Sequence, residues 1–361
     1  MELTTTRPAT GRLIGPDVVR AIAMSGVVIM NFHGYLVIRG AREGNGWAYD
    51  LFDTSRGPLA TRFAATFVLT AGVGVTLLTR SSIGDPQRVA DNRWRLARRG
   101  LLLYGFGMAF DFIWPGSILP YYGAMFVLAA GLFTLRSRTV IAVGAIAAVA
   151  GWGIRWWRYE REIREIDTSW LTRPGSRSPR GLVIDVFVNG THPLLPWLAF
   201  LCAGIVLGRL LTRGWWQPAA IGAGFVLFCV GTFLDAAAST RRTLVLLSND
   251  PFERGLAYTA SALGTALIAF GAIWWLAERY RDTWAIDCLR RAGQMSLSIY
   301  IAHALVFCLL VDWLEIVTPG GLGTALTFAL TYWVVSTAGA VAYHRRYGRG
   351  PAEYVYRKLG G

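Results

Sequence analysis

Histidine is the scarcest side chain in this sequence that could carry acid-base chemistry. Four histidines occur among 361 residues, at His33, His192, His303 and His344. A neutral imidazole is the usual general base for deprotonating a hydroxyl or an amine, because its pKa lies near physiological pH. A single histidine is more often a hydrogen-bonded structural residue. The four positions are therefore candidates for a site and do not by themselves define a reaction.

The apolar stretch of residues 15–38, which contains His33, also contains other polar residues. Asp17 and Arg20 are three positions apart at its start, and Asn31 follows Arg20 by eleven positions. Residues three positions apart lie on one face of a helix, so Asp17 and Arg20 can pair. Ionisable groups at membrane depth are costly, and each needs a partner or a function. The alternative for Arg20 is that it reaches lipid headgroups.

Two further groups of residues could bind a substrate. The segment 80–99 contains six arginines, among them Arg95, Arg98 and Arg99. Guanidinium groups bind phosphates well, so a donor such as a coenzyme A thioester could dock there. The alternative is the usual excess of positive charge on the cytoplasmic side, together with anionic lipid. Asp111 and Tyr122 would add a carboxylate and a phenol to an outer pocket.

The elements that must position these residues are transmembrane helices. The chain is 54% hydrophobic and 16% charged, with a mean hydropathy of +0.41. This is more apolar surface than a soluble core can bury. The apolar stretches are about 20 residues long, enough to cross a hydrocarbon layer roughly 30 Å thick, and no alternating pattern indicates a barrel. The sequence predicts an all-α, polytopic transmembrane helical bundle that forms one integral membrane domain over residues 1–361.

Ten spans are predicted, with both termini in the cytoplasm. They lie at residues 15–38, 58–79, 99–114, 117–135, 139–156, 192–211, 217–236, 256–277, 293–316 and 322–342. With this orientation most of the 36 basic residues, beginning with Arg7 and Arg12, fall on the cytoplasmic side, as the positive-inside rule expects. Residues 155–191 then form an extracytoplasmic loop with a partial helix, and residues 343–361 a basic cytoplasmic tail. The predicted location is the cell membrane.

Composition also excludes several partners. The net charge of +14 comes from short arginine runs between apolar segments, which does not indicate nucleic-acid binding. The four cysteines have no C-x-x-C spacing, so neither a disulfide nor a metal site is expected. The expected partners are membrane lipids and an extracytoplasmic glycan or small-molecule acceptor. The sequence does not specify an oligomeric state.

Several of these segments resemble a known family. The run from Asp17 through Arg20 to Asn31 is similar to the first helix of the heparan-alpha-glucosaminide N-acetyltransferase family and of the related bacterial YeiB-like proteins, which carry domain of unknown function 418. Residues 64–72, 192–209 and 347–353 fit the same group, and residues 293–303 resemble a late helix of the broader membrane acyltransferase group. The resemblance covers nearly the whole chain.

The resemblance implies transfer of an acyl group, acetyl in the first instance, from cytoplasmic acetyl-CoA to an extracytoplasmic sugar hydroxyl or amine. No metal cofactor is expected from the sequence. By similarity, Asn31 would orient the acceptor or the thioester. The position of the family's essential histidine in the first outer loop is Arg42 here. We therefore expect His33 to act as the base, with His192 as the second candidate. Asp17, Arg20 and His303 would serve the structure or the donor side.

Two other function classes stay open. A transporter or flippase for a lipid-linked or small polar substrate would use midplane charges and broken helices, for which His303 is the best candidate. A non-catalytic membrane scaffold would need none of these groups. The acyltransferase is the leading prediction because the first helix joins polar groups on both faces of the membrane and the outer helix ends gather His33, His192 and Asp111.

Overall fold

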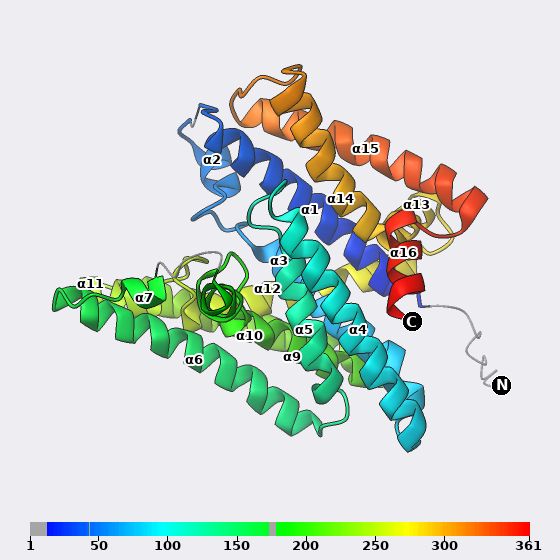
Figure 1. Cartoon of the computed structure of the whole chain (residues 1–361), viewed down its shortest axis with the longest axis horizontal. Helices are drawn as coiled ribbons and strands as arrows, with labels where there is room; N and C mark the ends of the chain where they lie inside the picture. Colours follow the sequence, from blue (N-terminus) through cyan, green and yellow to red (C-terminus); the bar gives the residue numbers. More distant parts are fainter. Residues whose placement is uncertain (1–12, 43, 173–177) are drawn as a thin grey trace, which may run out of the picture.

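The computed structural model of the chain describes residues 13–42, 44–172 and 178–361. Every regular element in these ranges is a helix (Figure 1), in agreement with the predicted all-α class. Arg7 and Arg12, which were counted with the cytoplasmic charge, lie outside the described residues. So do residues 173–177 of the predicted outer loop.

The long helices carry the apolar runs, and short helices connect them. The long helices are α1 (Gly15–Ile38), α3 (Arg62–Thr79), α4 (Pro86–Phe110), α5 (Leu119–Leu132), α6 (Ser137–Ile163), α9 (Leu194–Leu210), α10 (Trp216–Ala236), α12 (Leu256–Arg279), α14 (Ser296–Phe307), which the π-helical turn η3 (Cys308–Trp313) continues, and α15 (Leu322–Tyr347). The short helices are α2 (Trp47–Phe52), η1 (Arg80–Ser82), α7 (Ser169–Thr172), α8 (Pro179–Ile184), η2 (Asp185–Asn189), α11 (Arg241–Leu247), α13 (Trp284–Gln294) and α16 (Pro351–Gly360).

The number of membrane spans is only partly settled by helix length and composition. Each of the ten predicted spans overlaps a helix, but seven of the described helices are long and apolar enough to cross a membrane. The number becomes eight if Arg180–Asn189 and Leu194–Leu210, which are bent by 59°, form one span. The two other predicted spans coincide with α5, which has 14 residues, and with the apolar second half of α4. The count of ten stays a prediction.

The charged first half of α4 explains why this helix differs from the others. Asp85 caps its start by accepting hydrogen bonds from the backbone N–H groups of Gln87, at 3.0 Å, and Arg88, at 3.2 Å. Pro86 occupies the first turn, where the missing N–H costs nothing. The helix therefore begins in the arginine-rich segment and becomes apolar only after Gly100.

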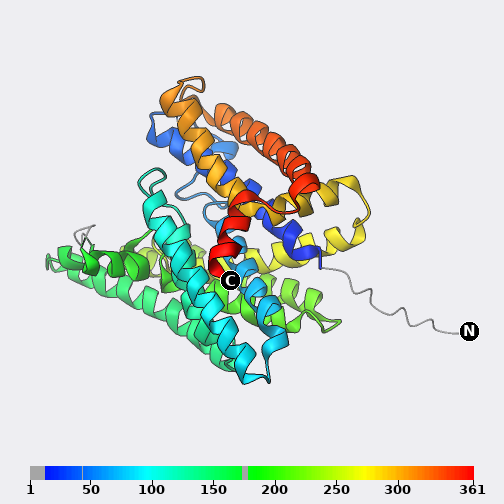
Figure 2. The ribbon, with the colours of Figure 1, turned by 45° about the vertical axis from the view of Figure 1, so that its right-hand side comes forward.

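α1 is the central helix of the bundle. It packs against α3, α12, α13, α14 and α15. In both views α14 and α15 lie on one side of α1, whereas α6, α9 and α10 lie beyond α3 on the other side (Figures 1 and 2). Phe32, fully buried on α1, stacks on Phe328 of α15 with ring centroids 4.3 Å apart.

The contacts between helix ends define two ends of the bundle. We call one the Asp17 end, where Gln294 donates a hydrogen bond to Asp17 and contacts His344 at the end of α15. We call the other the His192 end, where Tyr35 at the end of α1 donates to the carbonyl of Pro115. There the backbone N–H of Thr191, next to His192, donates to Tyr121 at 3.1 Å.

Close backbone contact between α3 and α9 depends on glycine. A Cβ atom on Gly72 would lie 2.2 Å from the carbonyl oxygen of Leu201, and one on Gly204 would lie 2.0 Å from that of Leu69. We expect Gly72→Val to lower the free energy of unfolding by about 1–3 kcal/mol, since the two helices must separate. The melting temperature of the detergent-solubilised protein measures this.

Gly105→Ala is the matched control, because a Cβ atom at Gly105 meets nothing within 4 Å among the described residues. It should leave the melting temperature unchanged or raise it slightly, since alanine favours helix. Equal melting temperatures for Gly72→Val and the wild type would show that α3 and α9 do not pack as described.

The predicted orientation places the Asp17 end in the cytoplasm. In a variant in which the four native cysteines are replaced by alanine, an impermeant maleimide should label Thr318→Cys in intact cells but label Thr283→Cys only after lysis. Both positions are exposed, and they lie beyond η3 and before α13, at opposite ends. The reverse labelling pattern would overturn the orientation.

Candidate functional site

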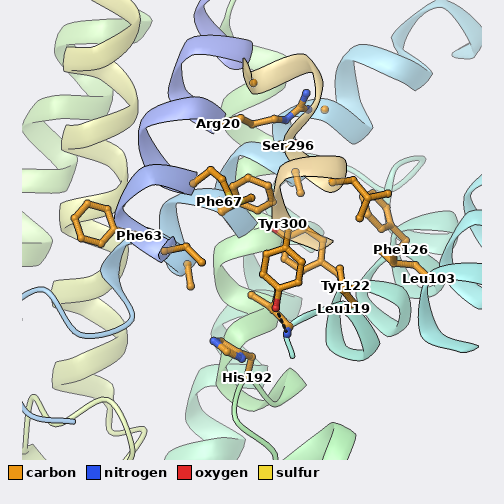
Figure 3. A pocket seen from close by; sticks show the side chains of 18 of the residues that line it. Arg20, Phe63, Phe67, Leu103, Leu119, Tyr122, Phe126, His192, Ser296 and Tyr300 are labelled. Atoms are coloured by element: carbon orange, nitrogen blue, oxygen red, sulfur yellow. Dashed lines mark hydrogen bonds between the residues drawn. The ribbon is translucent and has the colours of Figure 1, made fainter. Parts of the chain in front are cut away.

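A continuous cavity of about 1100 Å³ reaches both ends of the bundle. Its lining residues at the Asp17 end include Asp17, Arg20, Arg80, Arg95, Arg99, Gln294 and Arg357, and at the His192 end they include Thr54, Thr61, Trp114, Thr191, His192 and Phe252. Figure 3 shows Arg20 and His192 at opposite ends, with the rings of Phe67, Tyr122 and Tyr300 between them. The cavity therefore joins the arginine-rich face to one of the predicted outer histidines.

Asp17 and Arg20 form the predicted pair at the start of α1. The Arg20 Nη1 and Asp17 Oδ1 atoms are 3.4 Å apart, and both residues line the cavity. Asp17 also accepts a hydrogen bond from the Gln294 amide at 2.9 Å. A buried carboxylate with two donors is compensated inside the protein, so Arg20 is more than an anchor to lipid headgroups.

Arginines dominate the wall at this end. Arg20, Arg80, Arg95, Arg99 and Arg357 line the cavity, against the two carboxylates of Asp17 and Glu353. The Arg99 Nε atom is buried and has no hydrogen-bond partner among the described residues. A smaller cavity of about 390 Å³ adjoins this wall and adds Arg290 and Arg349. The excess of guanidinium groups suits an anionic ligand.

The three predicted donor-binding arginines do not share one position. Arg95 and Arg99 line the cavity, and Arg99 donates to the carbonyl of Gly361 at 2.7 Å. Arg98 instead donates to the carbonyl of Leu359 at 2.9 Å and lies outside the described lining. Arg98 therefore holds α16 and does not face the cavity.

Asn31 and His303 meet in the middle of the bundle. The Asn31 Nδ2 atom lies 3.0 Å from the His303 Nε2 atom, and Asn31 lines the cavity. His303 is fully buried, and its Nδ1 atom bonds the backbone carbonyl of Tyr300. The sequence singled out both residues but did not pair them.

Of the two residues predicted to form an outer pocket, Tyr122 lines the cavity and Asp111 does not. Tyr122 lines the cavity, and its buried hydroxyl has no partner among the residues that the structure describes. Asp111 accepts hydrogen bonds from the N–H groups of Gly116, at 2.9 Å, and Ser117, at 3.2 Å. Asp111 thus shapes the turn between α4 and α5 and is not among the described lining residues.

His192 presents an imidazole to the cavity. Its Nδ1 atom is buried and without a hydrogen-bond partner in the described part of the chain. The ring is held by Trp197, edge to face with centroids 4.6 Å apart. Arg254 holds the preceding segment through the carbonyls of Asn189, at 3.1 Å, and Gly190, at 2.6 Å. The imidazole thus borders the cavity in a fixed position, and its role toward a ligand depends on which nitrogen faces that ligand.

His33 is placed differently. It is buried, its Nδ1 atom lies 2.8 Å from the carbonyl oxygen of Phe52, and it is not among the described residues that line the cavity. Of the two predicted bases, His192, the second candidate, is the one that lines the cavity among the described residues.

Three residues that line the cavity, Gln294, Tyr300 and Thr61, were not singled out from the sequence. The first two lie in the segment that resembles a late acyltransferase helix, and this resemblance is the sequence feature that could have indicated them. The Tyr300 hydroxyl accepts a hydrogen bond from the backbone N–H of Ile118 at 3.2 Å. Thr61 has a positive φ of 62°, which is rare for a β-branched residue, and lies 2.7 Å from the Tyr258 hydroxyl. The positive φ of Thr61 is not predictable from a sequence pattern.

Potential metal ligands do not cluster among the described residues. No group of three or more histidine, cysteine, aspartate or glutamate side chains that could hold a metal ion occurs there.

Comparison with known proteins places these residues in a family. The family described as "Heparan-alpha-glucosaminide N-acetyltransferase, catalytic" matches residues 12–230. The chain belongs to this family. It is therefore a membrane protein of an acyltransferase-type family. The family described as "Protein of unknown function (DUF418)" matches residues 203–360.

A relative in Escherichia coli (strain K12), named "Uncharacterized protein YeiB", is 23% identical over 394 aligned positions. The alignment covers 95% of this chain and 94% of the relative. The first matched region holds Asn31 and His192, whereas Gln294 and His303 fall in the second. The cavity is thus built from both matched regions.

Glu353 attaches α16 to the start of α14 at the Asp17 end. Its carboxylate accepts hydrogen bonds from the backbone N–H groups of Leu297, at 2.7 Å, and Ser298, at 3.2 Å. It also accepts from the Ser298 hydroxyl at 2.5 Å. We expect Glu353→Ala to lower the free energy of unfolding by about 1–2 kcal/mol, because the first turn of α14 loses its cap. A thermal melt in detergent measures the change.

Glu278→Ala is the control for the loss of a carboxylate. Glu278 forms a solvent-exposed pair with Arg281 at 3.6 Å, and such pairs contribute little. An equal effect of the two substitutions would argue against the capping role of Glu353.

Proposed function

We propose that this protein transfers an acyl group, acetyl in the first instance, from an acyl-CoA bound at the Asp17 end to a hydroxyl or amine acceptor bound at the His192 end. The Asp17 end would face the cytoplasm and the His192 end the outside of the cell membrane. The observation that carries the proposal is the cavity lined by arginines at one end and by His192 at the other. The family to which the chain belongs supports the reaction type.

The donor would bind through its phosphates. Arg20, Arg95 and Arg99 line the Asp17 end, and acyl-CoA carries its phosphates at the end of the molecule opposite to the thioester. Anchoring the phosphates leaves the long arm of the donor free to enter the cavity. The thioester then reaches the middle of the bundle, where Asn31 and Tyr300 line the wall.

The acceptor, a glycan or a smaller molecule with a hydroxyl or amine, would bind at the His192 end. His192 would accept the proton from the attacking group as the new C–O or C–N bond forms at the thioester carbon. The C–S bond breaks, and the proton passes from the imidazole to the departing sulfur of coenzyme A. Acyl transfer of this kind requires no metal and no redox step.

A transporter or flippase is the second candidate function. A cavity that reaches both ends and a helix pair bent by 59° also suit alternating access. The two functions leave different products. Transport delivers the substrate chemically unchanged, whereas acyl transfer leaves an acylated acceptor on one side and free coenzyme A on the other.

Proteoliposomes with the Asp17 end outward test the proposal. Radiolabelled acetyl-CoA is supplied outside, and a panel of aminosugars and polyols is enclosed. We expect label on an enclosed acceptor, and a rate at least roughly 100-fold lower for His192→Gln, which keeps the packing against Trp197 but removes the base.

His33→Gln is the matched comparison, because His33 faces the carbonyl of Phe52. Its rate should stay within about 3-fold of the wild type, since removing a distant hydrogen bond leaves the reacting groups in place. A loss in His33→Gln equal to that in His192→Gln would return the base to His33. No labelled acceptor with the wild type would contradict acyl transfer, and unmodified substrate crossing the membrane would favour transport.

A further inference from the structure

The contact between Asn31 and His303 has a direction that the hydrogen-bond pattern fixes. The His303 Nδ1 atom bonds the backbone carbonyl of Tyr300, which can only accept, so Nδ1 carries the proton. In the neutral imidazole, Nε2 is then an acceptor. The Asn31 Nδ2 atom, 3.0 Å from Nε2, must therefore be the donor. The reversed amide would set two acceptors face to face.

The imidazole is held in this state by its surroundings. His303 has no exposed surface, and rings of Tyr300, Trp114 and Phe32 lie around it with centroids 4.7, 5.1 and 6.1 Å away. Full burial without a carboxylate partner among the described residues disfavours the charged imidazolium. The ring cannot turn without losing the bond to Tyr300. His303 is thus a rigid acceptor aimed at α1.

The amide oxygen of Asn31 is left without a partner. Asn31 lines the cavity, and no hydrogen bond to its Oδ1 atom occurs among the described residues. An amide fixed through its nitrogen presents its oxygen as an acceptor. The group that the cavity offers at mid-depth is therefore a hydrogen-bond acceptor and suits an N–H or O–H group of a ligand.

We propose that His303 is a positioning residue that locks the Asn31 side chain so that its Oδ1 atom accepts a hydrogen bond from an N–H or O–H group of the substrate. The identity of the substrate rests on the proposed acyl transfer, whereas the locked amide does not. Asn31 acts in this arrangement as an acceptor that orients the substrate, and His303 acts through Asn31 without touching the substrate.

The locked state has a spectroscopic signature that needs no activity. Protein labelled with 15N-histidine gives signals from four imidazoles, and His303 is assigned as the signal lost in His303→Gln, or by removing the other three histidines one at a time. We expect a neutral imidazole protonated at Nδ1, whose Nε2 signal shifts in Asn31→Leu. A signal protonated at Nε2, a cationic ring, or no response to Asn31→Leu would overturn the proposal.

Turnover provides the second measurement. His303→Gln places an amide oxygen near the former Nε2 position and should keep kcat within about 3-fold of the wild type. His303→Leu removes the acceptor, frees the amide and should lower kcat roughly 10- to 100-fold, with the KM for the donor changed by less than about 3-fold. Leu305→Ala, exposed on the same helix, is the control for a general effect on α14.

The two proposals fail in different ways. Absence of acyl transfer by the wild type contradicts the proposed function, and the 15N signals still decide the state of His303. Normal transfer by His303→Leu, or equal losses in kcat for His303→Leu and His303→Gln, contradicts the positioning role while leaving acyl transfer intact.

Discussion

Three polar contacts between α1 and the segment from Gln294 to Asp312 set the register of the whole bundle. Asp17 meets Gln294 at 2.9 Å, Asn31 meets His303 at 3.0 Å, and Arg39 meets Asp312 at 2.7 Å. They lie at the start, the middle and the end of α1. The three contacts follow the same order along both segments, so α1 and α14 run parallel, and the cost of an unpaired polar group at membrane depth holds the Asn31–His303 pair in this register.

Beside this pair, α4, α5 and α16 are attached near its two ends. At the His192 end the turn after α4 reaches Tyr300 through Ser117 and Ile118, at 3.2 Å each. At the Asp17 end α16 joins α4, through Arg98 and Arg99, to α14, through Glu353. The cavity lies between α1, α3, α4, α5 and α14, and the aromatic side chains of Phe67, Tyr122 and Tyr300 are part of its wall.

Helix positions and local pairs could be read from the sequence, whereas long-range partners could not. Asp17 and Arg20 were paired because a spacing of three is a property of any helix. Asp17 and Gln294 are 277 positions apart, and apolar periodicity does not mark which helices touch. The prediction of His33 as the base rests on its place at the end of the helix and not on the face of the helix that it occupies. Two positions turn a helix by about 200°, so His33 faces away from Asn31, while Gly34 and Tyr35 line the cavity with it.

The division of the chain into two matched regions has a physical consequence for the site. Residues 12–230 supply Arg20, Asn31 and His192, and residues 203–360 supply the groups that hold α1 in place, Gln294 and His303. Neither set is complete without the other, because an asparagine in hydrocarbon needs a fixed partner and a fixed partner has no function without a ligand group to orient. The second region also lines the cavity, through Tyr300 and Arg357, and in the proposed positioning role a change at His303 would reach the substrate through Asn31 of α1.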